Sequence, residues 1–179
     1  MVMEAIQVAE DSGRCRGMLD RRIYRNKKGM VLMKLNVYLA GEIHSNWREA
    51  IINACGDLEI NWSSPVTDHE ASDNCGVEIF GVEENKFWHD RKGALLNAIR
   101  TRTAIERCDV LVVCFGEKYK QWNAAFDAGF AAALSKPIIV LQPPEHDHAL
   151  KEVDAAAHAV ARTPEQVARA LRYVITAKR

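Results

Sequence analysis

The sequence predicts an α/β protein in which a five-stranded parallel sheet lies between two layers of helices, a three-layer sandwich. From Met33 onward, short apolar runs of strand length alternate with segments of helical pattern, which is the order that builds a parallel sheet. The chain has 179 residues, the length of one domain, and its 48% hydrophobic content is enough for a substantial core.

An apolar run and a helix start signal mark the first strand and helix. Residues 34–41, KLNVYLAG, form a strand that Gly41 ends. Asn46 followed three residues later by Glu49 is a capping-box pattern. It predicts a helix that continues to about Cys55.

The second strand precedes a long polar segment. Residues 58–64, LEINWSS, form the strand, and Pro65 ends it. From there to about Arg91 the chain is rich in Asp, Asn, Gly and Glu, with a turn signal at Asp73-Asn74. We expect a long ordered loop, and loops of this length are usually functional.

The third strand lies between two helices. A helical pattern covers roughly Lys92 to Arg107, and the apolar run at 109–116, DVLVVCFG, forms the strand. In the next helix, from Trp122 to Leu134, nearly every side chain is small or apolar. Because this helix has no polar face, we expect it to be buried all round.

Two strands and a helix complete the domain. PIIVLQ at 137–142 is the fourth strand, and EVDAAAHAVA supplies a short turn and a fifth strand near residues 158–161. Thr163-Pro164 opens the terminal helix, because proline is favoured in the first helical turn.

Residues 1–32 are expected to form a flexible tail before a single domain at residues 33–179. The tail mixes acids and bases and shows neither sustained helical nor strand periodicity. Its acids, among them Glu4 and Asp11, argue against a transit peptide. Translation starting at Met30 or Met33 would remove it, so the sequence leaves open whether it is made.

Composition excludes several classes of protein. Lys plus Arg and Asp plus Glu number 24 each, so the charge balance favours a small ligand over a nucleic acid polymer or a membrane surface. No apolar run approaches the ~20 residues of a membrane span. The five cysteines are odd in number and lack a CxxC pair, which argues against a disulfide framework. We expect a cytoplasmic protein.

Common cofactor and hydrolase motifs are missing from the sequence. There is neither GxGxxG nor GxxxxGK[ST], so a dinucleotide cofactor or a Walker-type phosphate site is unsupported. No serine lies in a GxSxG context. We therefore expect no cofactor.

The polar segment after the second strand carries two groups of candidates. The loop SPVTDHEASDNCGVE contains Asp68 and Asp73, but its spacing matches neither the HExxH helix nor a calcium loop. We prefer a loop that closes over a ligand to a metal site, and expect no metal. Asn85 precedes Phe87 and Trp88, aromatic side chains that suit either stacking on a flat ring or core packing.

Asp127 is the most informative single residue, because it is a carboxylate set in an apolar helix. Burying an unpaired carboxylate costs several kcal/mol. Asp127 therefore has either a tight partner or a place facing a polar cavity. Asn123 lies four residues earlier, on the same helical face.

Other candidates follow the strands of the predicted sheet. In open parallel sheets ligands bind beyond the carboxyl ends of the strands, where Tyr38, Gly41 and Asn123 are expected. Gly41 either lets a ligand approach the backbone or only makes a tight turn. Arg100 or Arg102 can bind a phosphate or carboxylate, although a helical arginine is usually only solvated.

Five segments of the chain resemble one known family. They are YLAG at 38–41, NCGVEIFG at 74–81, NKFW at 85–88, NAIRTR at 97–102 and FGEKYKQWNAAFDAG at 115–129. Together they closely resemble the YtoQ family, small bacterial proteins related to nucleoside 2-deoxyribosyltransferases. The resemblance covers Met33 to about Thr176.

This resemblance implies a nucleoside deoxyribosyltransferase-like domain of flavodoxin or Rossmann type. In those transferases a helix glutamate is the nucleophile that attacks the anomeric carbon of deoxyribose, and Asp127 occupies its place here. The chain would thus be a transferase or a glycosidase acting on the N-glycosidic bond of a nucleoside or nucleotide, with water or another base resolving the glycosyl-enzyme.

Roles for the remaining candidates follow from the same resemblance. Asp68 or Asp73 would protonate the leaving base, and Tyr38 would orient the nucleophile or the sugar. The residues expected to bind substrate are Gly41, Asn85, Trp88, Asn97, Arg100, Trp122 and Asn123. A homo-oligomer is expected, since related transferases complete their sites with a neighbouring subunit. The alternative is a non-catalytic nucleotide-binding or regulatory module on the same fold.

Overall fold

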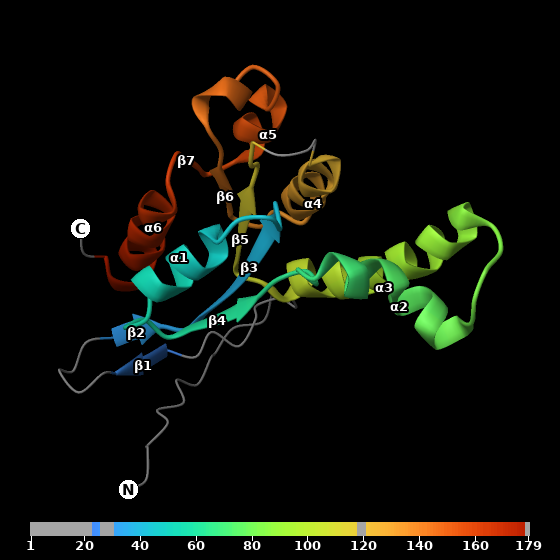
Figure 1. The fold of residues 1–179 in the computed structure, drawn as a ribbon. Coiled ribbons are helices and arrows are strands. Elements are labelled where there is room, and N and C mark those ends of the chain that lie inside the picture. The colour runs from blue at the N-terminus through green and yellow to red at the C-terminus, as the bar shows by residue number, and fades with distance from the viewer. Residues whose placement is uncertain (1–22, 26–30, 118–120, 178–179) are drawn as a thin grey trace, which may run out of the picture.

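A parallel sheet forms the centre of the structure, a computed structural model that describes residues 23–25, 31–117 and 121–177 (Figure 1). Its strands are β3 (Leu35–Gly41), β4 (Ile60–Ser63), β5 (Val110–Cys114), β6 (Ile138–Leu141) and β7 (Ala159–Ala161). They pair in the order β4-β3-β5-β6-β7, and every pair is parallel. This is the flavodoxin-type order, with the switch point between β3 and β5. The predicted five-stranded parallel sheet is confirmed.

Helices cover both faces of the sheet (Figure 1). They are α1 (Trp47–Ala54), α2 (His69–Phe80), α3 (Lys86–Arg107), α4 (Trp122–Ala133), α5 (Lys151–Ala156) and α6 (Pro164–Thr176), with a short 3₁₀ turn at Pro144–His146. Helices α1 and α6 lie on one face, whereas α3, α4 and α5 lie on the other. The three-layer arrangement is therefore as predicted.

Alternate residues of β3 enter two different hydrophobic cores. Val37 and Leu39 pack on the face that carries α1 and α6, and Tyr38 and Ala40 pack on the face that carries α3 and α4. This follows from the period of two along a strand. Tyr38 consequently lies on the same face of the sheet as Asp127 of α4.

The long loop predicted after β4 is wrong, because most of that segment is helical. Helix α2 and the first turns of α3 occupy it, and the two helices form an arm that projects from the sheet (Figure 1). Asp68 acts as a helix cap, since its side chain accepts a hydrogen bond from the Ala71 amide at 2.9 Å. Gly76 and Gly93 let α2 and α3 approach closely, because a Cβ on Gly76 would overlap the Gly93 backbone.

Helix α4 is buried along one stripe only, which corrects the prediction that it is buried all round. Ala124, Ala128 and Ala131 recur at helical spacing and are buried on the α3 face of the sheet. The larger side chains of Trp122 and Phe126 are 74% and 62% exposed. Small residues thus make the close contact with the sheet, Phe130 packs against the edge of the core, and Trp122 and Phe126 are exposed.

Two shorter predictions also differ from the structure. Asn46 does occupy the position before α1, but its side chain makes no capping hydrogen bond, so the capping box with Glu49 is not formed. The short turn predicted before the fifth strand is helix α5. In both places the sequence pattern spans only a few residues, and the ends of short helices are difficult to predict from such patterns.

Part of the predicted tail has strand structure. β1 (Ile23–Arg25) pairs antiparallel with β2 (Val31–Met33), with Ile23 opposite Met33. The rest of residues 1–32 lies outside the described residues. Within the described part of the chain, none of the helices combines the length and hydrophobicity needed to cross a membrane.

Candidate functional site

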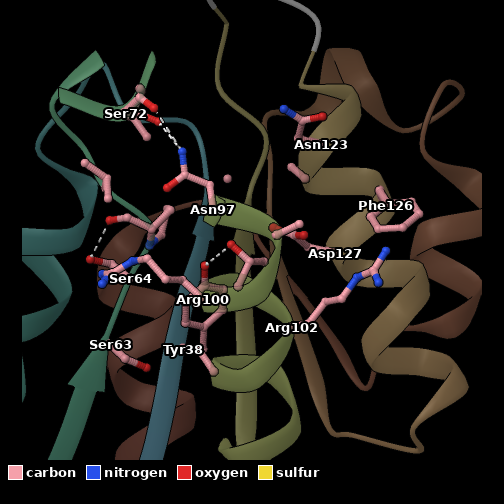
Figure 2. Close-up of a pocket in the computed structure, with 18 of the residues that line it drawn as sticks. Tyr38, Ser63, Ser64, Ser72, Asn97, Arg100, Arg102, Asn123, Phe126 and Asp127 are labelled. Carbon is pink, nitrogen blue, oxygen red and sulfur yellow. Dashed lines mark hydrogen bonds between the residues drawn. The ribbon is translucent and has the colours of Figure 1, made fainter. Parts of the chain in front are cut away.

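An open cleft with a volume of about 1970 Å³ runs along α3, between the ends of β3 and β4 on one side and α4 on the other (Figure 2). Eight of the eleven predicted site residues line it: Tyr38, Gly41, Asp73, Asn97, Arg100, Trp122, Asn123 and Asp127. The cleft lies beyond the carboxyl end of β3, beside the switch point of the sheet, which is the usual place for a ligand in this topology.

Asp127 points from α4 into this cleft (Figure 2). Burial raises the pKa of its carboxyl from 3.8 to about 6. Among the described residues, none makes a hydrogen bond or an ion pair with Asp127. Of the two explanations that the sequence left open, the structure thus favours a carboxylate that faces a cavity over one held by a tight partner.

Tyr38 is held beneath the cleft by the sheet and by α3. Its ring is buried, and its hydroxyl donates a hydrogen bond to Oγ1 of Thr101 at 3.3 Å. Burial, with a smaller contribution from the charge of Asp127, raises the pKa of Tyr38 to about 12. The phenol therefore stays neutral at physiological pH and keeps its proton for donation. Thr101 was not among the predicted site residues, because only the fold brings it to Tyr38.

Gly41 is required by the close approach of two strands. It has a φ of +103°, and a Cβ there would overlap the carbonyl group of Cys114 on β5. The next residue, Glu42, donates its amide hydrogen to that same Cys114 carbonyl at 3.1 Å. Of the two explanations for Gly41, the geometry directly supports the tight turn.

Glu42 and Arg48 fix the loop that follows β3. The buried carboxylate of Glu42 accepts hydrogen bonds from the His44 amide and from Ser45 Oγ. The buried guanidinium of Arg48 donates to the carbonyls of Leu39, Gly41 and Glu42. Both charged side chains are therefore occupied in shaping one wall of the cleft. Sequence reasoning missed them, since neither lies in a recognisable motif.

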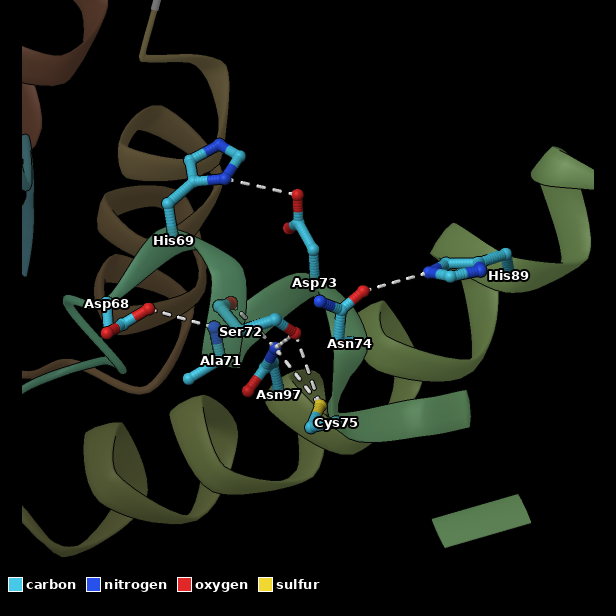
Figure 3. A network of polar contacts seen from close by, with 9 residues as sticks. All are labelled: Asp68, His69, Ala71, Ser72, Asp73, Asn74, Cys75, His89 and Asn97. Atoms are coloured by element: carbon cyan, nitrogen blue, oxygen red, sulfur yellow. Dashed lines mark hydrogen bonds and ion pairs between the residues drawn. The ribbon is translucent and has the colours of Figure 1, made fainter. Parts of the chain in front are cut away.

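A network of polar contacts joins α2 to α3 at the other wall (Figure 3). Asn97 donates from Nδ2 to the carbonyl and the hydroxyl of Ser72 at 3.1 and 3.0 Å. His69 Nδ1 lies 3.2 Å from Asp73 Oδ2, and both side chains are more than half exposed. Asn97 thus holds the two helices together, while Asp73 and His69 remain open to the cleft.

Three predicted site residues do not line the cleft. The side chain of Asp68 is occupied as the cap of α2. Asn85 caps α3 in the same way, accepting from the Phe87 amide at 2.9 Å. Trp88 lies in the first turn of α3, where it packs edge to face on Phe87 and under the Arg91 guanidinium. The NKFW segment is therefore a helix start at the end of the arm.

Further polar groups line the cleft. Ser63 and Ser64, which the sequence did not assign, stand at the carboxyl end of β4. Arg102, the alternative to Arg100 as an anion-binding candidate, lies on α3 next to Thr101. Figure 2 shows Arg102 on the α4 side of the cleft, near Phe126 and Asp127. Within the described ranges, no group of three or more His, Cys, Asp or Glu side chains is arranged to hold a metal ion.

Comparisons with known sequences find one family along most of the chain. The family model described as "Nucleoside 2-deoxyribosyltransferase YtoQ" matches residues 38–175. The curated protein "Uncharacterized protein YtoQ" of Bacillus subtilis (strain 168) is 43% identical over 144 residues, which cover 79% of this chain and 97% of that protein.

Comparisons with solved structures agree on the fold. A 2-deoxyribosyltransferase from Bacillus psychrosaccharolyticus aligns with a TM-score of 0.50 at 18% identity, covering 74% of this chain and 90% of that chain. A conserved protein from Enterococcus faecalis V583 aligns with a TM-score of 0.52 at 14% identity, covering 79% and 99%. At these identities the likeness concerns the fold alone.

Proposed function

Because the chain belongs to the nucleoside 2-deoxyribosyltransferase YtoQ family, we propose that it cleaves or transfers at the N-glycosidic bond of a nucleoside or nucleotide, with Asp127 as the nucleophile. One observation carries this proposal. Asp127 is a partly buried carboxylate with a raised pKa, pointing into the cleft without a pairing partner among the described residues. Such perturbed groups in clefts are typical of catalytic residues.

The proposed reaction proceeds in two displacements. A carboxylate oxygen of Asp127 attacks the anomeric carbon while the bond from that carbon to the base nitrogen breaks, and the bonding electrons leave with the base. The product is a glycosyl ester of Asp127. Water or a second base then attacks the same carbon and releases the carboxylate. With a pKa of about 6, the carboxyl group is mostly ionised at pH 7 and ready to attack.

The departing base needs a proton, and Asp73 is the acid that we assign to this step. Of the two acids expected to supply it, Asp73 lines the cleft, whereas Asp68 is occupied as a helix cap. The imidazole of His69 lies 3.2 Å from this carboxyl group.

Substrate positioning is assigned to groups on both sides of Asp127. Tyr38 offers a neutral hydroxyl that can orient the sugar or the attacking carboxylate. Asn123 lies one turn before Asp127 on α4, in reach of a sugar hydroxyl. Trp122, largely exposed at the cleft, takes the base-stacking role that the sequence suggested for Trp88.

A second candidate function is a non-catalytic nucleotide-binding module. The same open cleft would accommodate a nucleotide without cleaving it. The enzyme would release free base from its substrate, whereas the binding module would bind the nucleotide without releasing the base.

The experiment is a panel of nucleosides and 5′-monophosphates incubated with the protein, with free base measured by chromatography. We expect base release by the native protein and a loss of more than 100-fold in Asp127→Ala, since the covalent route is removed. Glu152→Gln, on exposed α5 away from the cleft, is the matched control and should keep full activity. Ligand-induced thermal stabilisation without base release from any substrate would instead establish the binding module.

We also propose that the protein is cytoplasmic and works as a homo-oligomer. Cys55, Cys75, Cys108 and Cys114 are free thiols, which is the usual state in a reducing compartment. Large apolar side chains are exposed on the arm and on α4, and exposed apolar patches commonly mark protein interfaces.

A further inference from the structure

Two guanidinium groups in the cleft have no partner in the described structure. Arg100 and Arg102 both line the cleft, yet no described residue forms an ion pair or hydrogen bond with either. Two of the acids at the walls already have partners: Glu42 accepts two hydrogen bonds, and Asp73 contacts His69. Arg100 and Arg102 therefore remain available to an anionic group of a ligand.

The helix places the two arginines on opposite sides of the reaction centre. Residues two apart on a helix do not face the same way. Thr101, between them, faces Tyr38 and accepts a hydrogen bond from its hydroxyl group. Figure 2 shows Arg100 on the side of Ser63 and Ser64, and Arg102 on the side of α4.

Arg100 lies across the cleft from the start of α4, where Trp122 is assigned to base stacking. In Figure 2, Asn123 and Arg100 appear on opposite sides of Asp127. The base and the 5′ carbon leave opposite ends of a nucleoside sugar. A substrate whose anomeric carbon meets Asp127 and whose base stacks on Trp122, the neighbour of Asn123 on α4, therefore directs its 5′ end towards Arg100.

We propose that Arg100, with the hydroxyls of Ser63 and Ser64, binds a phosphate on the 5′ position of the sugar, so that the substrate is a nucleoside 5′-monophosphate. This inference rests on the proposed function of the same cleft. A guanidinium fork matches two phosphate oxygens, which a neutral 5′ hydroxyl cannot replace.

Both serine hydroxyl groups can donate a hydrogen bond to an anion. Ser63 Oγ donates to the Val37 carbonyl at 3.4 Å, and Ser64 Oγ donates to the Pro65 carbonyl at 3.2 Å. Both hydrogen bonds are long and therefore weak, and a hydroxyl hydrogen rotates freely to a better acceptor. A phosphate between β4 and Arg100 would supply that acceptor.

The charge of Arg100 is also felt at Tyr38. Burial raises the pKa of Tyr38, and the guanidinium of Arg100 makes a smaller contribution that lowers it.

The test measures binding in the absence of turnover. In an Asp127→Asn background, isothermal titration calorimetry compares each nucleoside with its 5′-monophosphate. We expect the monophosphate to bind about 10- to 100-fold more tightly, which is the usual contribution of hydrogen bonds to a charged group. Arg100→Gln should abolish that difference and leave the affinity for the nucleoside unchanged. Arg169→Gln, an exposed arginine of α6 outside the cleft, should change neither affinity.

Each other outcome overturns the assignment in a distinct way. Equal affinity for nucleoside and monophosphate, unaffected by Arg100→Gln, would refute the phosphate site while leaving the proposed function intact. If Arg102→Gln, and not Arg100→Gln, removed the preference for the monophosphate, the phosphate would bind on the α4 side of the cleft instead. Inorganic phosphate that binds through Arg100 and accelerates base release from nucleosides would make phosphate a co-substrate. If neither class of ligand binds, the proposed function fails together with the inference.

Discussion

The carboxyl group of Asp127 is partly removed from water. The same burial that raises its pKa to about 6 makes it a stronger base than an exposed aspartate and costs folding free energy. Changes of pH or substitutions that alter the charge of this carboxyl group should therefore change both the activity and the stability of the protein.

The pH dependence of activity follows from the direction of that shift. Above pH 6 the carboxyl is ionised and can attack; below it, the proton blocks the nucleophile. We expect kcat/KM for base release to fall about tenfold per pH unit below pH 6, because only the ionised fraction reacts. Steady-state rates between pH 4.5 and 8 measure this. A rate that stays constant down to pH 4.5 would exclude Asp127 as the group that must be ionised.

The stability of the folded protein should improve when this charge is removed. A pKa raised from 3.8 to about 6 means that ionised Asp127 opposes folding above pH 6, by roughly 3 kcal/mol at 1.36 kcal/mol per unit. Asp127→Asn should therefore be more stable than the native protein at pH 7. The advantage should shrink as the pH falls from 6 towards 3.8, since the native carboxyl becomes protonated.

Urea denaturation at pH 7 and pH 4.5 measures the difference. Glu152→Gln, an exposed acid of α5, is the control and should change stability by less than about 0.5 kcal/mol. If Asp127→Asn were destabilising at pH 7, the carboxylate would have a stabilising partner, contrary to its surroundings in the structure.

At the scale of elements, the arm depends on two glycines. A Cβ on Gly76 of α2 would overlap the backbone of Gly93 on α3, and a Cβ on Gly93 would lie 2.9 Å from the Asp73 carbonyl. Gly76→Ala should therefore separate the helices and lower the free energy of unfolding by about 1–3 kcal/mol, as overpacking does. It should also weaken base release, because Asn97 and Asp73 are placed by this contact.

Gly129 of α4 provides the matched control. Nothing lies within 4 Å of a Cβ built on it, so the substitution fits. Gly129→Ala should raise stability by about 0.5–1 kcal/mol, since alanine is the better helix former. Thermal unfolding of both variants measures the two effects, and equal destabilisation by both would show that the α2–α3 contact is not specific.

At the scale of the whole molecule, the arm exposes Ile79, Phe80, Val82, Phe87 and Trp88. We propose that a second copy of the chain covers these side chains. Light scattering should then give a mass above the 20.1 kDa of one chain. Phe80→Asp should lower the measured mass towards that of one chain, because it places a charge in the contact, whereas substitution of the exposed Tyr173 of α6 by serine, Tyr173→Ser, should not. A native mass of 20.1 kDa at micromolar concentration would refute this contact.

The cleft exists only because distant segments converge. β3 supplies Tyr38 and the carboxyl end of β4 supplies Ser63, while α3 contributes Arg100 and α4 contributes Asp127. The parallel topology brings the ends of β3 and β4 to one edge of the sheet. The shape of the cleft therefore depends on the order of the strands as well as on the residues that line it.

The sequence by itself determined the sheet and the identity of the central carboxylate. Strand periodicity and helix signals are local properties, so the strands from Leu35 to Ala161 could be predicted from neighbouring residues. An acid in an apolar helix is also a local anomaly, and the residues around Asp127 are enough to reveal it. The same local reasoning missed α2, because its polar residues give a weak helical pattern.

Only the tertiary structure decided which of the predicted site residues lie together in the cleft. Asp68 and Asp73 are alike in sequence, yet one caps a helix and the other lines the cleft. Trp88 and Trp122 are both exposed aromatics on helices, and the packing of the arm leaves only Trp122 at the cleft. Thr101 contacts Tyr38 across 63 residues of chain. Burial, pairing and distance between such residues are set by the folded arrangement of whole elements, which local periodicity does not encode.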